Sequence, residues 1–136
     1  MRLLRIAKGT WDVLAACDER GECQTLNLLM SFEKGDKKRR KHARALLAML
    51  REYVPVFGAP KATERCEALE DGIYAFRSPA SQIRLLWFYE KGRVIICTHA
   101  FLKPGQRLDR TQLDRAKRIR AGYQEALSRG VVEIVE

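Results

Sequence analysis

Three stretches near the middle of the chain decide the fold: Gly72-Ile-Tyr-Ala-Phe-Arg77, Gln82-Ile-Arg-Leu-Leu-Trp-Phe-Tyr89 and Arg93-Val-Ile-Ile-Cys-Thr-His-Ala-Phe101. All three are rich in β-branched and aromatic residues, which pack well on a pleated sheet surface. The two connections, Ser78-Pro-Ala-Ser81 and Glu90-Lys-Gly92, have the length of hairpin loops. The pattern predicts an antiparallel meander, with helices covering at least one face of its nearly all-apolar middle strand.

Two helices are predicted before this meander. Residues 23–33 fit a short helix, and from Lys37 to Val54 apolar residues recur every three or four positions, as on one face of an α-helix. Asp36 is expected to cap the second helix, because its carboxylate can accept from free backbone N–H groups. Pro55 is expected to end it.

A further helix is predicted after the meander. It is expected to begin near Asp109, which has capping-box spacing to Gln112, and to stop at Gly130. The residues expected on its buried stripe are Leu113, Ala116, Ile119, Tyr123 and Leu127. The tail from Val131 to Val135 fits either a short edge strand or a disordered end.

These elements, with a strand from Trp11 to Cys17, predict an α+β fold. About four strands would form a small antiparallel-rich sheet, packed against two N-terminal helices and a C-terminal helix. A length of 136 residues fits a single domain over residues 1–136.

The composition indicates a polyanionic partner. Twenty-six Lys and Arg residues against 17 Asp and Glu residues give a net charge of +9. Such a balance favours nucleic acid, an anionic membrane or an acidic partner, although a merely basic soluble protein has the same signature. No apolar run approaches the roughly 20 residues that span a bilayer, and no signal-peptide core is visible. We therefore expect a cytoplasmic protein.

The four cysteines are Cys17, Cys23, Cys66 and Cys97, and none forms a Cys-x-x-Cys pair. They are expected to be reduced thiols, with Cys97 inside a buried strand. A zinc site of Cys17, Cys23 and a histidine stays open, although its spacing matches no metal-binding template. No metal and no cofactor is expected.

The most biased segment is the run Lys37, Lys38, Arg39, Arg40 and Lys41 at the start of a predicted helix. Consecutive side chains wind around a helix, so the five cations cannot share one contact. They fit a solvated face and also a surface that binds RNA phosphates, since such contacts supply much of the affinity for nucleic acid.

A sharper signal is Arg84, which interrupts the apolar run Ile83-Arg-Leu-Leu-Trp-Phe88. It fits either a buried ion pair, with Glu67 or Glu70, or a functional site. On adjacent antiparallel strands Arg84 could converge with the other candidates for catalysis, Arg77, His99, Lys103 and Arg107. Arginine can bind phosphate oxygens with two parallel bonds and histidine can exchange protons, and few acids lie nearby to hold metal ions. The cluster therefore suits metal-free RNA cleavage.

Two stretches resemble the RelE/HigB-type toxins of bacterial type II toxin–antitoxin modules. Gln82–Tyr89 is similar to a strand of that family in which an arginine is followed by two apolar residues and an aromatic residue. Val94–Lys103 is similar to the next strand of the family, which ends in a Phe-x-Lys turn. Asp114-Arg-Ala-Lys-Arg-Ile-Arg120, with Tyr123, resembles the following helix in the phage-derived branch of that superfamily. The resemblance covers about residues 69–125. It implies a RelE-like fold.

The resemblance also implies an activity, namely ribosome-dependent cleavage of mRNA. Arg84 matches the arginine that binds the scissile phosphate, while Arg77, Lys103 and Arg107 match basic residues beside it. His99 matches only some branches, and the general base is unassigned. The implied partners are mRNA on the ribosome, rRNA, which Arg118 and the cationic run would contact, and a cognate antitoxin, expected to be a helix-turn-helix protein. The alternative is a non-catalytic RNA-binding or phage-derived structural or regulatory protein of the same fold.

Overall fold

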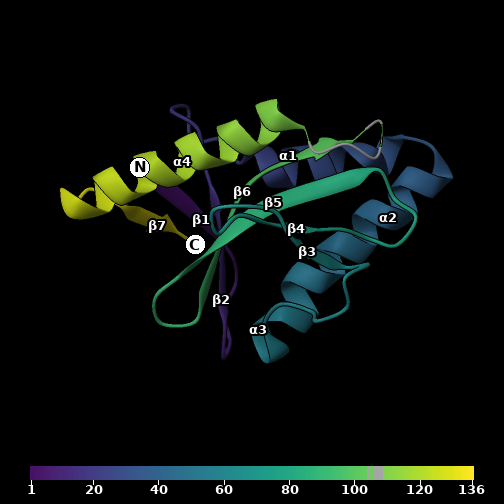
Figure 1. The fold of residues 1–136 in the computed structure, drawn as a ribbon, viewed down its shortest axis with the longest axis horizontal. Helices are drawn as coiled ribbons and strands as arrows, with labels where there is room; N and C mark the ends of the chain where they lie inside the picture. The colour runs from purple at the N-terminus through teal and green to yellow at the C-terminus, as the bar shows by residue number, and fades with distance from the viewer. Residues whose placement is uncertain (104, 106–108) are drawn as a thin grey trace.

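The protein is described by a computed structural model that covers residues 1–103, 105 and 109–136 (Figure 1). Within these ranges a mixed seven-stranded sheet has the order β3-β4-β5-β6-β2-β1-β7. Neighbours from β3 to β6 are antiparallel, as are β1 and β2, whereas β2–β6 and β1–β7 are parallel. The strands are β1 Arg2–Ala7, β2 Asp12–Ala16, β3 Cys66–Ala68, β4 Tyr74–Phe76, β5 Ile83–Glu90, β6 Val94–Leu102 and β7 Glu133–Val135.

The α+β class is as predicted, but the sheet is larger than the four strands expected. β2, β4, β5 and β6 are the predicted strands, and β1, β3 and β7 extend the sheet at its two ends. The tail is therefore ordered as an edge strand, which pairs with β1 at Arg2↔Glu133 and Leu4↔Val135. Pairing across the sheet, rather than local propensity, accounts for these short strands.

The helices are α1 Gln24–Ser31, α2 Lys37–Ala48, α3 Val54–Phe57 and α4 Arg110–Ser128, with a 3₁₀ turn at Phe32–Lys34 and a π-helical turn, η2, at Met49–Tyr53. Asp36 caps α2 as predicted, since its Oδ1 accepts from the backbone N–H of Arg39 at 2.9 Å. No helix in the described part of the chain combines the length and apolarity needed to cross a bilayer.

The prediction that Pro55 ends the second helix is wrong. The helical path continues through η2 and α3 to Phe57, and Pro55 lies in the first turn of α3. A proline is tolerated in a first turn because its missing N–H needs no partner there. The wider π turn just before it lies where an uninterrupted α-helix would bring the proline ring against the preceding turn.

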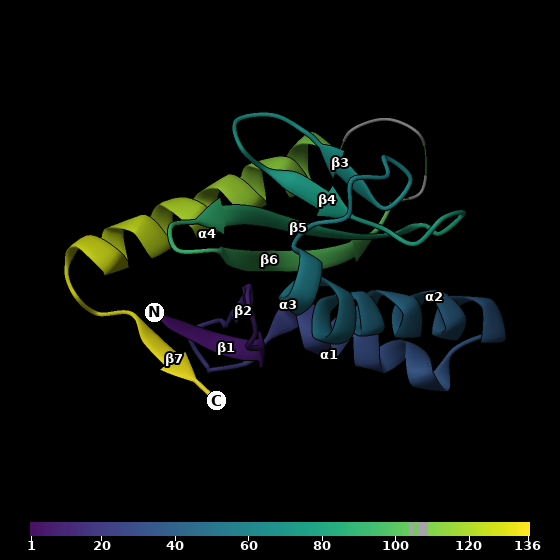
Figure 2. The ribbon, with the colours of Figure 1, turned by 90° about the horizontal axis from the view of Figure 1, so that it is seen from below.

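The helices cover both faces of the sheet (Figure 2). On one face α1, α2 and the η2 turn cover β5 and β6, and Leu29, Leu46 and Leu50 share one core with Leu85 and Trp87. On the other face α4 packs through Leu113, Ala116 and Tyr123 against Leu86 and Phe88. Residues of β5 therefore alternate between two apolar cores, which explains why the strand is apolar along nearly its whole length.

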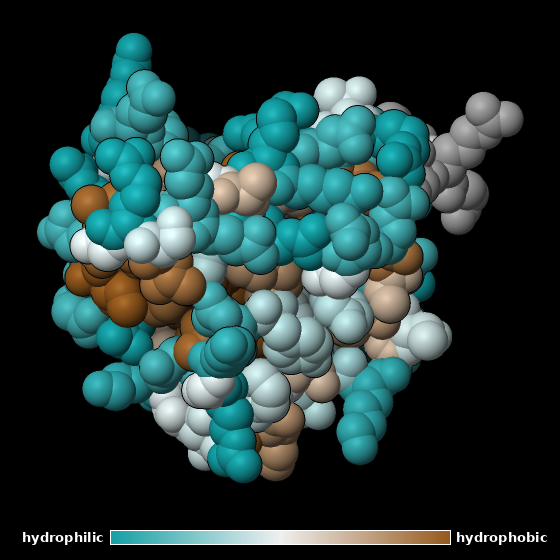
Figure 3. Space-filling view, turned by 60° about the vertical axis from the view of Figure 1, so that its left-hand side comes forward, coloured by the Kyte–Doolittle hydropathy of each residue, from teal (hydrophilic) through white to brown (hydrophobic). Residues whose placement is uncertain are grey.

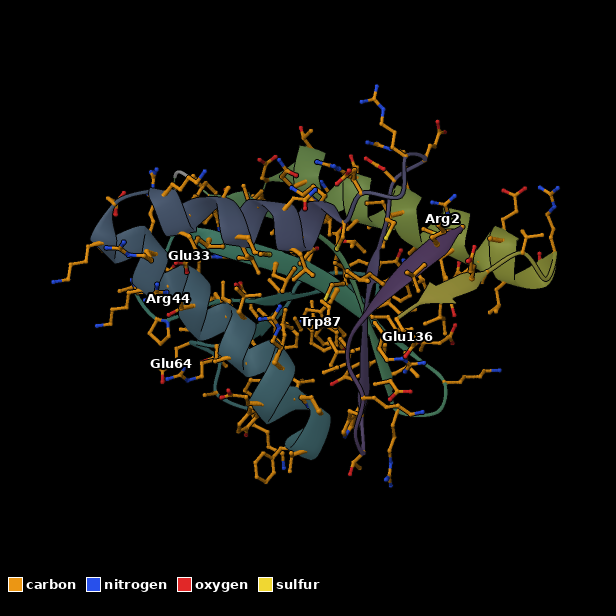
Figure 4. The ribbon with its side chains drawn as sticks, turned by 180° about the vertical axis from the view of Figure 1, so that it is seen from behind. Arg2, Glu33, Arg44, Glu64, Trp87 and Glu136 are labelled. Carbon is orange, nitrogen blue, oxygen red and sulfur yellow. The ribbon has the colours of Figure 1, made fainter. Side chains whose placement is uncertain are left out.

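Trp87 lies in the interior between the helices and the sheet (Figure 4). Its ring stacks on those of Tyr74 and Phe76, with centroid distances of 4.7 and 4.5 Å, and it is fully buried. This aromatic stack joins β4 to β5 and fixes the register at Tyr74↔Trp87 and Phe76↔Leu85. The end of β4 is thereby placed opposite the start of β5.

One residue at the carboxyl end of α4 was predicted wrongly as buried. Leu113, Ala116 and Tyr123 are buried as expected, but Leu127 is 50% exposed. The last turns of α4 extend past the paired strands at the centre (Figure 1). The apolar face of these turns therefore has no central strand to pack against. Figure 3 shows apolar surface gathered on this side of the molecule among hydrophilic side chains. The exposed apolar residues near this end are Leu127, Val131, Ile134 and Val135.

Candidate functional site

Three predicted cations come together where β4, β5 and β6 meet at one end of the sheet. Arg77 follows β4, Arg84 is the second residue of β5, and Lys103 follows β6. The register Phe76↔Leu85 continues to bring Arg77 beside Arg84, and the backbone N–H of Lys103 donates to the Gln82 carbonyl at 2.7 Å. The hairpin geometry, not sequence proximity, therefore assembles the cluster.

These three side chains line a pocket of about 450 Å³, which we call the arginine pocket. Its other described lining residues are small or polar and include one carboxylate residue, Glu64: Glu64, Ser78, Pro79, Ala80, Ser81, Gln82 and Gly105. A pocket lined by three cations and by hydroxyl and amide groups is suited to a phosphate group.

Arg84 has no acidic partner in the described part of the chain. Its Nη1 donates to the carbonyls of Ser81 at 2.6 Å and Ile83 at 3.1 Å, and its Nε is buried without a hydrogen-bond partner. Burial lowers the pKa of Arg84, the charge of Arg77 lowers it further, and Glu67 opposes the effect. The guanidinium is thus held at the pocket, partly desolvated and next to a like charge.

The alternative of a buried ion pair for Arg84 is not what the structure shows. Glu67 instead lies 3.7 Å from Arg77, and Glu70 accepts from Arg110 and Lys117 at 2.8 Å each. An arginine that is desolvated without a counter-ion costs stability.

Arg77 is anchored by the segment between α3 and β3, on which Glu64 lies (Figure 4). Its Nε donates to the Glu64 carbonyl at 3.1 Å and its Nη2 to the Thr63 carbonyl at 3.0 Å. These bonds use one side of the planar guanidinium and hold its orientation. Arg77 and Arg84 both donate to backbone carbonyls, and these bonds orient the two guanidinium groups at the pocket.

His99 lies on the same face of the sheet as Arg84 but is sealed beneath α4. It pairs with Leu86 in the sheet and has no exposed surface. Its Nε2 lies 2.8 Å from Gln112 Oε1, and its Nδ1 lies 3.1 Å from Thr98 Oγ1. Burial lowers the pKa of His99 to about 4. His99 is therefore a neutral interior residue that does not line the arginine pocket.

Tyr123 is interior as well. Its hydroxyl donates to Glu90 at 2.5 Å and its ring packs against Phe88, while burial and the Glu90 bond raise its pKa. Among the remaining candidates, Arg107 lies outside the described residues. Arg118 is exposed on α4 and lines neither pocket described here.

The cationic run divides between two faces of α2. Lys38 and Arg39 line a second pocket of about 420 Å³, whereas Lys37, Arg40 and Lys41 do not. We call it the histidine pocket, because His42 also lines it. Its described lining residues are Asp36, Lys38, Arg39, His42, Ala80, Ser81, Gln82, Ile83 and Leu102. Sequence reasoning missed His42, which follows the cations directly and carried no signal of its own beyond being a histidine.

A tight turn separates the two pockets. The backbone N–H of Ser81 donates to the Ser78 carbonyl at 3.0 Å, and Ala80 has a φ of 63°. Pro79 at the second position and a left-handed Ala80 at the third are the features of a type II turn. Alanine is strained in the left-handed conformation, whereas glycine is not. His42 Nδ1 lies 2.8 Å from Ser78 Oγ and joins α2 to this turn.

The described residues contain no group of three or more His, Cys, Asp or Glu side chains that could hold a metal ion. The four cysteines are free thiols, and Cys17 and Cys23 face each other in an isolated antiparallel bridge. Cys97 is fully buried in β6, as predicted.

The chain matches a model of a known protein family. The family model described as phage-derived protein Gp49-like (DUF891) matches residues 30–121, which span α2, the turn, both pockets and most of α4. No curated protein matches the chain. The matched range contains Arg77, Arg84 and Lys103, as well as His42 and the cationic run.

Proposed function

The chain belongs to the Gp49-like family of phage-derived proteins, and from that membership and the geometry of the arginine pocket we propose that it is a toxin that cleaves mRNA on the ribosome. The Gp49-like family is toxin-like and related to the RelE/HigB toxins. The proposal includes a cognate antitoxin and rRNA contacts as partners.

One observation carries the proposal: Arg84 is partly desolvated at a pocket, beside Arg77 and Lys103, without a carboxylate partner in the described residues. Two backbone carbonyls accept from Arg84, but no acid neutralises its charge, and a desolvated charge without a counter-ion costs stability. A bound phosphate would supply the missing counter-ion and so explain why the chain has a charged residue at position 84. The Arg84 and Arg77 guanidinium groups can each offer two N–H donors to phosphate oxygens.

The chemistry follows from those contacts. The 2′-hydroxyl oxygen of the RNA attacks the adjacent phosphorus as its proton passes to water, and the bond to the 5′-oxygen breaks as that oxygen takes a proton from water. The products are a 2′,3′-cyclic phosphate and a free 5′-hydroxyl. The charge that develops on the phosphorane oxygens is stabilised by Arg84 and Arg77, with Lys103 adding a third cation. This step needs no metal ion.

A second candidate is a non-catalytic RNA-binding protein that uses the same pocket. It is favoured by the positions of His99 and Tyr123, which are both buried and hydrogen-bonded away from the arginine pocket. Neither can transfer a proton to a bound phosphate from there. The two candidates share the cation cluster and differ only in bond cleavage.

Controlled expression in a bacterial host tests the proposal. Induction should arrest growth and produce new 5′ ends within the coding region of an abundant mRNA, detected by primer extension. Arg84→Met should remove both effects and stay folded. Arg84→Lys, which keeps the charge but loses the planar fork, should reduce them. Arg20→Gln serves as a control, because Arg20 is exposed and lines neither pocket.

Intact growth and intact transcripts at high expression would overturn the toxin proposal. Binding of RNA by the purified protein, lost in Arg84→Met, would then establish the second candidate. An Arg84→Met protein that fails to fold would show instead that the arginine is structural.

A further inference from the structure

The arginine pocket and the histidine pocket share one wall. Ala80, Ser81 and Gln82 of the turn between β4 and β5 line both of them, one pocket on each side of the turn. His42 on α2 is bonded to Ser78 at the start of the turn, and Arg84 is bonded to the carbonyl of Ser81 at its end. A chain-like ligand that crosses this short turn can therefore enter both pockets.

We propose that the histidine pocket binds a phosphate adjacent to the one held in the arginine pocket, so that one single strand of RNA crosses the turn between them. This inference rests on the proposed function and adds to it a second subsite and a requirement on the substrate, which must carry at least two phosphates in one strand.

The lining of the histidine pocket suits a phosphate of an exposed strand. Lys38 and Arg39 are exposed, and neither is needed to pack the core. The Lys38 ammonium makes no ion pair within the described ranges, and Arg39 has only a long contact of 3.8 Å with Asp36. Asp36 is already engaged in capping α2, so it does not fill the pocket's cationic side.

His42 contributes a neutral hydrogen-bonding ring. Burial lowers the pKa of His42, and the nearby charges of Lys38 and Lys41 lower it further. With Nδ1 held by Ser78, its orientation is fixed between the turn and the two cations. Two cations beside a fixed neutral donor or acceptor match one phosphate and its sugar better than they match an apolar ligand.

The structure also provides a matched control outside the cationic run. Arg20 and Lys34 are exposed like Lys38 and Arg39, and they line neither pocket. Lys38→Gln/Arg39→Gln and Arg20→Gln/Lys34→Gln each replace one lysine and one arginine, so they remove the same net charge. A general electrostatic effect would weaken RNA binding equally in both, whereas a subsite responds only to the first pair.

The experiment measures the affinity of the purified protein for 2′-O-methyl RNA, which cannot be cleaved, as a dinucleotide with one phosphate and as a tetranucleotide with three. The wild type should bind the tetranucleotide more tightly. Lys38→Gln/Arg39→Gln should lose about tenfold in affinity for the tetranucleotide and less than about twofold for the dinucleotide. Its salt dependence should weaken by a slope of about 0.7, as expected for one lost phosphate contact on a single strand.

Equal losses in the two double variants, or no loss in Lys38→Gln/Arg39→Gln, would overturn the second subsite. Arg84→Met separates the two proposals, because it should abolish binding of both ligands. Loss in Arg84→Met with an unaffected Lys38→Gln/Arg39→Gln keeps the proposed function and removes the subsite. Binding that survives in Arg84→Met overturns the proposed function and, with it, the shared strand.

Discussion

Mild acid should weaken the fold through one buried side chain, His99. In the folded protein its pKa is about 4, against an ordinary value of 6.5, because burial under α4 disfavours the charged ring. Between these two pH values the unfolded chain binds a proton that the folded chain refuses. The free energy of unfolding is therefore complete above pH 6.5 and falls as the pH decreases towards 4.

The size of the effect follows from the two pKa values. Each pH unit between them is worth about 1.4 kcal/mol, so the loss should be about 2 kcal/mol at pH 5 and about 3 kcal/mol at pH 4. The interval above pH 5 is the cleaner one. The carboxyl groups of Glu33, Asp36 and Glu70 have pKa values lowered by their partners, and they add their own loss of stability at lower pH.

Urea unfolding followed by tryptophan fluorescence measures the prediction, because Trp87 is fully buried and becomes exposed on unfolding. The wild type should lose about 2 kcal/mol between pH 7.5 and pH 5. His99→Gln keeps a hydrogen-bonding side chain opposite Gln112 but cannot titrate, so it should lose much less. His42 is present in both proteins and cancels in the difference. Equal pH dependence in the two proteins would refute the reasoning.

Three further outcomes are expected. Arg84→Met should have a free energy of unfolding equal to that of the wild type or higher by up to about 1 kcal/mol, since it removes a desolvated charge with no acidic partner. Urea unfolding measures this. Asp109→Ala should lower the free energy of unfolding by about 1 kcal/mol, because Asp109 caps α4 at Thr111 and Gln112; Glu125→Ala, later in the same helix, is the control. Cys66 and Cys97 should react slowly with iodoacetamide at pH 8 in the folded protein, since burial raises the pKa of Cys66 to about 11 and also raises the pKa of Cys97. Mass spectrometry after alkylation measures the labelling. Rapid labelling of Cys97 would contradict the prediction.

The centre of the fold could be predicted from sequence because its pattern is local. β-Branched and aromatic runs separated by short turns identify β4, β5 and β6, and Asp36 and Asp109 identify the starts of α2 and α4. β1 and β7 could not be found this way. Arg2 and Arg5 interrupt the apolar pattern of β1, and their partners Glu133 and Glu136 lie at the other end of the chain.

The candidate site was predictable where a residue broke a pattern. Arg84 stands out in an apolar strand, and the structure shows it at a pocket with Arg77 and Lys103. Burial of a histidine has no such signature, so His99 could not be recognised as interior. His42 was hidden beside five cations, and its link to Ser78 spans 36 positions of the chain.

The parallel pairing of β2 with β6 joins two parts of the sheet that are each built from strands close in sequence. β5 and β6 form one hairpin and β1 and β2 form another, but the pairing of Asp12 with Val94 joins residues far apart in the chain. Closing so long a loop costs entropy before any contact rewards it, which slows the step. We therefore expect the two hairpins to form early and their junction to form late. In amide hydrogen exchange the β2–β6 boundary would then be the line along which the protein opens.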